Sequence, residues 1–209
     1  MLAVISKGIL FGLLLAVMLG PVFFALIQNS IIKGFKVGIY MAIGIAVADT
    51  SYIFLMYFGV RLFQNNDVVS FWMGVLGGLI ILISGILSLR KKTIHLESQE
   101  VNTQRTNFFK QFAKGFILNG INPFVLLYWL GVMTLVTKSY GYTQTEVIVF
   151  FSGIIGTLII TDFSKVALSH RLRTWVTPKR LNVLNKIVGV ALILFSFRLF
   201  YHAVEHYNF

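Results

Sequence analysis

Long apolar runs alternate with short polar stretches along the whole chain. Each run is close to the ~20 residues that an α-helix needs to cross a hydrocarbon core of about 30 Å. The pattern therefore predicts an all-α membrane protein with six transmembrane helices. The predicted spans cover residues 8–32, 37–60, 68–89, 112–136, 146–168 and 183–203.

One polar stretch is much longer than the others. It reads RKKTIHLESQEVNTQRTNFFK and covers residues 90–110. We interpret it as a mobile linker between two three-helix repeats, residues 1–89 and residues 111–209. Both repeats would belong to one integrated membrane domain.

The composition agrees with a membrane protein. Hydrophobic residues make up 57% of the 209 residues and charged residues only 12%, whereas about a quarter of a soluble domain is charged. A soluble chain of this length could not bury so much apolar surface. There is no cysteine, which excludes disulfides and thiol chemistry. The run after Lys7 continues too far for a signal peptide, so we interpret it as a retained span.

The net charge of +11 could suggest a nucleic-acid partner, but the basic residues fall between the apolar runs. Twelve Lys and Arg residues follow the first, third and fifth spans, and four lie on the other side. This bias predicts a cytoplasmic linker and two outside termini. Contact with anionic lipid explains the charge equally well, so we predict no nucleic-acid partner.

The two halves of the chain contain similar short motifs in the same order. Because each half has three spans, the second half would begin on the opposite side of the membrane. Such inverted repeats recur in secondary transporters that have broken helices and a site near the midplane. The matched motifs are Lys7-Gly8 with Lys114-Gly115, Gly20-Pro21 with Asn122-Pro123, and Asp49 with Asp162.

The first and fourth spans are predicted to break near Pro21 and Pro123. Proline lacks an N–H group and clashes with the carbonyl four residues earlier, so the carbonyls of Val17 and Asn119 should be freed. Gly20 allows a close backbone or solute approach. A freed carbonyl is tolerated in a membrane where it lines a polar cavity or finds a new partner. We therefore predict a small polar site, although kinks that only shape helix packing are the alternative. The nearby amide side chains are Gln28, Asn29, Asn119 and Asn122.

Two acidic residues lie within predicted spans. A charge at Asp49 would be costly there, so its carboxyl must be protonated, paired or wet. It could relay protons, bind a substrate ammonium group, or cap freed backbone groups. Asp162 precedes Lys165 by one helical turn, so a local ion pair explains it as well as a functional role does. No His spacing suggests a metal site, and we predict no cofactor.

The chain resembles the LysE/RhtB family of amino-acid exporters. The resemblance rests on GILFGLLLAVMLGPVFFALIQNSIIKGFKVGIYMAIGIAVAD, residues 8–49, and on FAKGFILNGINPFVLLYWLGV, residues 112–132. It implies export of amino acids or close derivatives across a bacterial inner membrane, coupled to the proton motive force. Many family members carry Lys after the Asn-Pro pair, whereas this chain has Phe124, so substrate preference cannot be inherited from those members. The positions that match the family are Gly20, Pro21, Asp49, Asn122 and Pro123.

Other functions remain open on the sequence alone. Efflux of another small solute or a metal ion is one, although the chain is poor in His and acids. An intramembrane aspartyl enzyme using Asp49 and Asp162 is another, but neither residue has the glycine-framed motif of such enzymes. A membrane scaffold is a third. The transported amino acid, the coupling ion and any homo-oligomeric state are also left open.

Overall fold

The computed structural model describes residues 1–17, 21–63, 67–90, 107–172 and 177–205, and its regular structure there is helical throughout. The predicted all-α class is confirmed. The first half forms α1 (Leu2–Val17), α2 (Pro21–Lys33), α3 (Phe35–Phe63) and α4 (Asp67–Arg90). The second half forms α5 (Phe108–Gly120), α6 (Pro123–Thr134), the π-helical turn η1 (Leu135–Tyr140), α7 (Gln144–Ala167), α8 (Ser169–Leu172) and α9 (Pro178–Glu205). Residues 91–106 of the predicted linker lie outside the described residues.

Local sequence signals set the start of two helices in the second half. Pro123 occupies the first turn of α6, and the Asn122 side chain accepts a hydrogen bond of 3.1 Å from the N–H two residues later. Proline suits this position because its missing N–H would have no helical partner. At α7, Thr143 and Glu146 form a capping box, in which each side chain accepts a hydrogen bond from the other residue's backbone N–H. These signals place the start of α6 at the predicted interruption and the start of α7 two residues before the predicted fifth span.

Helix length and composition identify membrane-spanning candidates. In the described ranges, Phe35–Phe58 of α3 and Gln144–Ala167 of α7 are each long and apolar enough to cross a membrane. In two further cases, a pair of consecutive helices is long and apolar enough to span a membrane only when the two helices are taken together. Both pairs are bent, α1 and α2 by 70° and α5 and α6 by 64°. Each bent pair is either a broken span or a re-entrant loop. The predicted count of six spans therefore stays a prediction.

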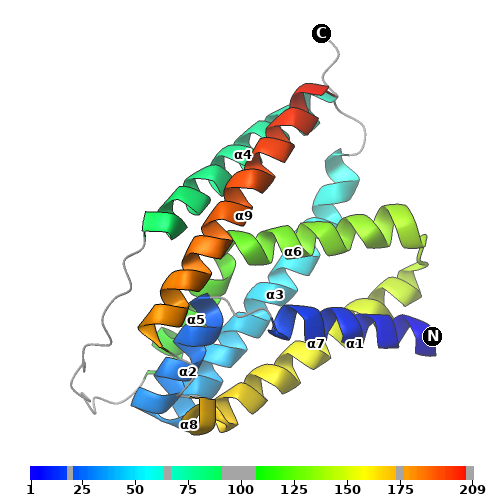
Figure 1. The fold of residues 1–209 in the computed structure, drawn as a ribbon. Helices are drawn as coiled ribbons and strands as arrows, with labels where there is room; N and C mark the ends of the chain where they lie inside the picture. The colour runs from blue at the N-terminus through cyan, green and yellow to red at the C-terminus, as the bar shows by residue number, and fades with distance from the viewer. Residues whose placement is uncertain (18–20, 64–66, 91–106, 173–176, 206–209) are drawn as a thin grey trace.

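Three helix pairs build most of the molecule (Figure 1). α1 packs along α7, α5 along α3, and α4 along α9. Each pair joins one helix from the first half to one from the second half. Glycines allow two of these close approaches, since a Cβ at Gly8 would collide with the Phe150 carbonyl and one at Gly115 with the Met41 carbonyl. The two halves are thus interlocked rather than placed side by side as separate units.

The core and the outer surface are both apolar. Trp129, Phe150 and Ile154 are almost completely buried in a cluster that joins α1, α6 and α7. Large apolar side chains also cover the outside; Leu55 and Ile160, for example, are each 68% exposed. Water would penalise such a surface, whereas lipid would not. The fold therefore fits a membrane environment.

Candidate functional site

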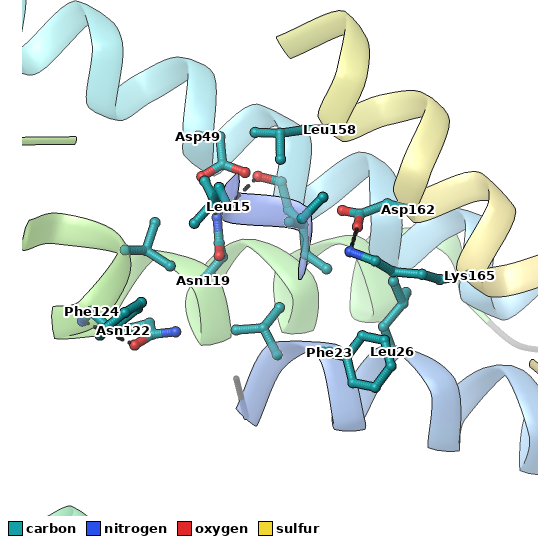
Figure 2. Close-up of a pocket in the computed structure, with 14 residues that line it drawn as sticks. Leu15, Phe23, Leu26, Asp49, Asn119, Asn122, Phe124, Leu158, Asp162 and Lys165 are labelled. Atoms are coloured by element: carbon teal, nitrogen blue, oxygen red, sulfur yellow. Dashed lines mark hydrogen bonds and ion pairs between the residues drawn. The ribbon is translucent and has the colours of Figure 1, made fainter. Parts of the chain in front are cut away.

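A pocket lies inside the bundle, where α2, α3, α5, α6 and α7 meet the C-terminal end of α1 (Figure 2). It has a cavity volume of about 60 Å³, which is enough for several water molecules. Helices from both halves of the chain contribute to its wall. Most of the wall is apolar, and the polar residues that line it are Asp49, Asn119, Asn122, Asp162 and Lys165.

Asp49 is the more deeply buried of the two acids that line this pocket, and only 3% of its surface is exposed. Its Oδ1 atom accepts hydrogen bonds of 2.9 Å from Asn119 Nδ2 and of 2.9 Å from Trp129 Nε1. Both donors are neutral, and within the described residues no Lys or Arg pairs with this carboxyl. Its second oxygen, Oδ2, accepts no hydrogen bond from the part of the chain that the structure describes. That oxygen is available to a proton or a solute.

The break between α5 and α6 is closed differently from the sequence prediction. The prediction that Pro123 frees the carbonyl of Asn119 is wrong, because that carbonyl accepts the N–H of Asn122 at 3.1 Å. The chain leaves α5 at Gly120 and starts a new helix, so proline disrupts no continuous ladder. At this break the Gly120 carbonyl accepts a hydrogen bond of 2.6 Å from the Tyr52 hydroxyl. The break is thereby tied to α3, three residues beyond the buried acid.

A second acid lies at another part of the same pocket. The local ion pair, one of the two interpretations of Asp162 that the sequence left open, is present: Lys165 Nζ lies 2.8 Å from Asp162 Oδ1. The same Nζ lies 5.7 Å from the ring centroid of Phe23 on α2, which is within cation–π range. In Figure 2 this ion pair lies at the opposite end of the pocket from Asn122 and Phe124. A basic group is therefore held inside the protein next to the cavity.

Four of the residues predicted from the sequence come together in this pocket, namely Asp49, Asn119, Asn122 and Asp162. Pro123 instead lines a neighbouring pocket of about 250 Å³ between α4, α5 and α9. Val22 and Asn122 border both pockets. These two side chains therefore separate the central cavity from the space beside α4 and α9.

The remaining predicted residues lie on α2 or just before it. The Asn29 amide donates to a carbonyl one turn earlier in α2 at 2.7 Å and accepts from a lysine of α5 at 3.1 Å. Neither Asn29 nor Gln28 lines the pocket. Pro21 begins α2. Gly20 lies outside the described residues, and the prediction of a freed carbonyl at Val17 depends on residues 18–20, which also lie outside them.

Sequence reasoning missed two hydrogen-bonding aromatic residues. Trp129 donates to the buried acid, and Tyr52 ties the break to α3. The residue types themselves could have indicated such a role, because the polar atom of a buried Trp or Tyr side chain usually forms a hydrogen bond. Tyr52 also follows Asp49 at a spacing that places both on one helix face.

The site offers no obvious metal chemistry. In the described part of the chain, no group of three or more His, Asp and Glu side chains could hold a metal ion. No hydrogen bond joins Asp49 to Asp162 among the described residues. What the arrangement can do is hold a small polar solute between an acid and an ion pair.

These features define a helical membrane protein with a small pocket between its helices that carries buried polar and charged side chains, an arrangement found in transporters. The model of the LysE type translocators matches residues 13–203, and the chain belongs to this family of transporters. A Bacillus subtilis (strain 168) protein named "Putative amino acid efflux protein YcgF" is 29% identical over 201 residues, which is 94% of this chain and 95% of that protein. An Escherichia coli (strain K12) protein named "Uncharacterized membrane protein YahN" is 21% identical over 187 residues, covering 88% of this chain and 83% of that protein. No solved structure matches the chain.

Proposed function

We propose that this chain is a secondary transporter that exports amino acids or close derivatives across the bacterial inner membrane, driven by the proton motive force. The observation that carries the proposal is the environment of Asp49. Its carboxyl is buried inside the bundle, one oxygen is held by two neutral donors, and the other accepts no hydrogen bond from the described residues. Family membership and the name of the Bacillus subtilis relative support amino acids as the solute.

In this proposal the six spans form two inverted three-helix repeats, residues 1–89 and 111–209, joined by a cytoplasmic linker. The pairing of α1 with α7 and of α5 with α3 supports it. In each case the first helix of one repeat packs against the middle span of the other repeat. That exchange is expected of two halves related by a pseudo-two-fold axis.

The proposed mechanism is alternating access around the two helix breaks. Asp49 would carry a proton in one state and contact the substrate ammonium group in another. An ionised carboxyl without a partner is unfavourable inside a membrane, so Asp49 should bind either a proton or the substrate ammonium group. Proton and substrate would therefore exclude each other at this carboxyl, which couples their opposite movements.

The orientation of the transporter in the membrane follows from the charge bias. The linker and the connections after the first and fifth spans carry most of the basic residues and would face the cytoplasm. Both termini would then lie outside. Fusing a reporter that is active only in the cytoplasm to the linker and to each terminus would check this arrangement.

The first test is amino-acid efflux from bacteria that produce the protein. Cells are loaded with a mixed dipeptide pool, and every amino acid in the medium is quantified over time. We expect selective export by the native chain and its loss in Asp49→Asn at equal membrane abundance. Glu146→Gln is the control, since Glu146 is a partly exposed acid in the first turn of α7 and does not line the pocket. If Asp49→Asn exports the same amino acids as the native chain, Asp49 has no coupling role. If folded protein exports no amino acid selectively, the proposal of amino-acid export is wrong.

An intramembrane aspartyl enzyme is the second candidate, because Asp49 and Asp162 line one pocket. An aspartyl dyad needs two carboxyls that share a proton. Here Asp162 is bound to Lys165, and no hydrogen bond joins the two acids in the described residues. Counterflow of an unmodified solute across proteoliposomes is expected of a transporter. Product formation without counterflow would favour the enzyme.

A further inference from the structure

We propose that Lys165 binds the carboxylate of the transported amino acid while the free Asp49 oxygen binds its ammonium group. The wall between them then selects small, uncharged, apolar side chains. This inference rests on the proposed export function and names the substrate class of the same site. It follows from the charges, the position of the lysine and the lining of the pocket.

The charges of the pocket match a zwitterion. Among the described residues, three ionisable side chains line it, those of Asp49, Asp162 and Lys165. Lys165 lies 2.8 Å from Asp162 and compensates its charge, so Asp49 is the lining acid that has no cationic partner among the residues the structure describes. One such acid suits one ammonium group. A second positive charge, as on lysine or arginine, would find no second unpaired acid among the described lining residues.

The position of Lys165 makes it available to a substrate carboxylate. A lysine ammonium group has three donors, and one of them is used by Asp162. A lysine within a span usually extends toward the water interface. Here the Lys165 and Asp162 side chains are only 16% and 12% exposed, and the ammonium group lies against the face of Phe23. The remaining donors can therefore reach a solute in the cavity, and Asp162 acts as the positioning residue.

The rest of the wall is hydrocarbon and aromatic. A polar substrate side chain would lose its water without finding partners there, which is unfavourable, whereas an apolar one gains from burial. The volume of about 60 Å³ corresponds to roughly four to six water-sized groups, so the cavity favours short apolar side chains over long ones. The nine apolar lining residues are Leu15, Ala16, Val22, Phe23, Leu26, Ile45, Phe124, Val125 and Leu158.

Counterflow in proteoliposomes that contain the full chain tests this substrate class. Labelled L-valine is the probe, and unlabelled compounds compete with it. Isobutylamine is valine without its carboxylate, and isovalerate is valine without its ammonium group. We expect L-alanine and L-valine to compete at least about tenfold better than either fragment, since each charged group supplies a charge-assisted hydrogen bond. L-lysine and L-glutamate should compete as poorly as the fragments. If either competes as well as L-valine, the proposed selectivity is wrong.

Variants of Lys165 test the carboxylate contact directly. Lys165→Gln should raise the half-saturating valine concentration at least about tenfold and leave the weak competition by isobutylamine unchanged, because the amine has no carboxylate. Lys165→Arg should restore part of the affinity. Lys36→Gln is the control, since Lys36 is exposed at the start of α3 and away from the pocket. Unchanged valine affinity in Lys165→Gln, or equal weakening of valine and isobutylamine, would overturn the assignment.

The inference and the proposed function fail in different ways. If native protein that is verified as folded supports no counterflow of any amino acid, the export proposal fails. If amino acids are exchanged but isobutylamine competes as well as valine, export stands and the carboxylate contact fails. The fragment comparison uses the native chain, so it decides the question even where Lys165→Gln does not fold.

Discussion

Replacing Gly115 with alanine adds one methyl group at the contact between α5 and α3. The new Cβ would collide with the carbonyl group of Met41 and lie 3.1 Å from the Met41 side chain. A backbone carbonyl inside a helix cannot move alone, so the two helices must separate. Asn119 lies one turn further along α5, and the same movement lengthens its 2.9 Å hydrogen bond to Asp49. The substitution therefore tests both the packing and the site.

Two opposing contributions set the size of the effect. Alanine is favoured over glycine within a helix by about 0.5–1 kcal/mol. Overpacking of a tight contact costs about 1–3 kcal/mol, and the obstacle here is backbone rather than a flexible side chain. We expect the free energy of unfolding of Gly115→Ala to fall by about 1–2 kcal/mol.

The matched control is Gly131→Ala in α6, where a Cβ would meet nothing within 4 Å. This change keeps the helix preference and lacks the collision, so it should stabilise the protein by about 0.5–1 kcal/mol. Thermal unfolding of both variants in detergent micelles measures the difference. The two midpoints should move in opposite directions from that of the native chain.

Transport provides the second measurement for the glycine variants. Gly115→Ala should lower valine counterflow at equal protein content, whereas Gly131→Ala should leave it unchanged. Two variants of equal stability would refute the close contact between α5 and α3. A destabilised Gly115→Ala with native counterflow would refute the argument that this contact positions Asn119 beside Asp49.

Three further substitutions probe single hydrogen bonds around the pocket. Trp129→Phe keeps a buried ring but removes one donor to Asp49; it should lower stability by about 1.5–3 kcal/mol and change the dependence of counterflow on the proton gradient. Tyr52→Phe removes the hydroxyl that holds the Gly120 carbonyl, which should cost about 0.5–1.5 kcal/mol in thermal unfolding and reduce export. Asn122→Ala removes the cap of α6; it should cost about 1 kcal/mol and also weaken valine affinity in counterflow, because Asn122 lines the pocket.

Two controls separate stability from function in these tests. Asn107→Ala removes the equivalent cap of α5, where the side chain accepts the Phe109 N–H at 3.0 Å, but Asn107 lies outside the pocket. It should cost similar stability and leave valine affinity unchanged. Tyr40→Phe is the control for Tyr52→Phe, because the Tyr40 ring packs against Phe108 and it does not line the pocket. Equal loss of export in each control and its partner would show that general destabilisation explains the results.

A large part of the architecture could be predicted from the sequence. The periodic apolar runs indicated an all-helical membrane protein, because lipid requires long apolar segments whose backbone groups are satisfied within each helix. Proline also marked the start of α6, since it lacks the N–H that a helix interior needs. Asp49 and Asn119 were recognisable as candidate site residues because polar groups are unfavourable among hydrocarbon side chains. These are properties of residue type and local spacing.

Other features depended on which helix faces meet. Gln28 and Asn29 lie on α2 near the predicted break, yet neither lines the pocket, because helix rotation decides which side a residue faces. Trp129 reaches Asp49 from a helix that begins more than seventy residues later. Sequence spacing cannot reveal such a contact without the packing of α3, α5 and α6.

The sequence by itself determined that the protein is a helical membrane protein and which of its polar residues are unfavourable in lipid. Only the tertiary structure decided how these residues are satisfied. It paired Asp162 with Lys165 at the cavity wall, gave the Gly120 carbonyl to Tyr52, and left one oxygen of Asp49 without a hydrogen bond from the described residues. The physical reason is that helix formation depends on neighbouring residues, whereas a polar site depends on distances between helices that are far apart in the chain.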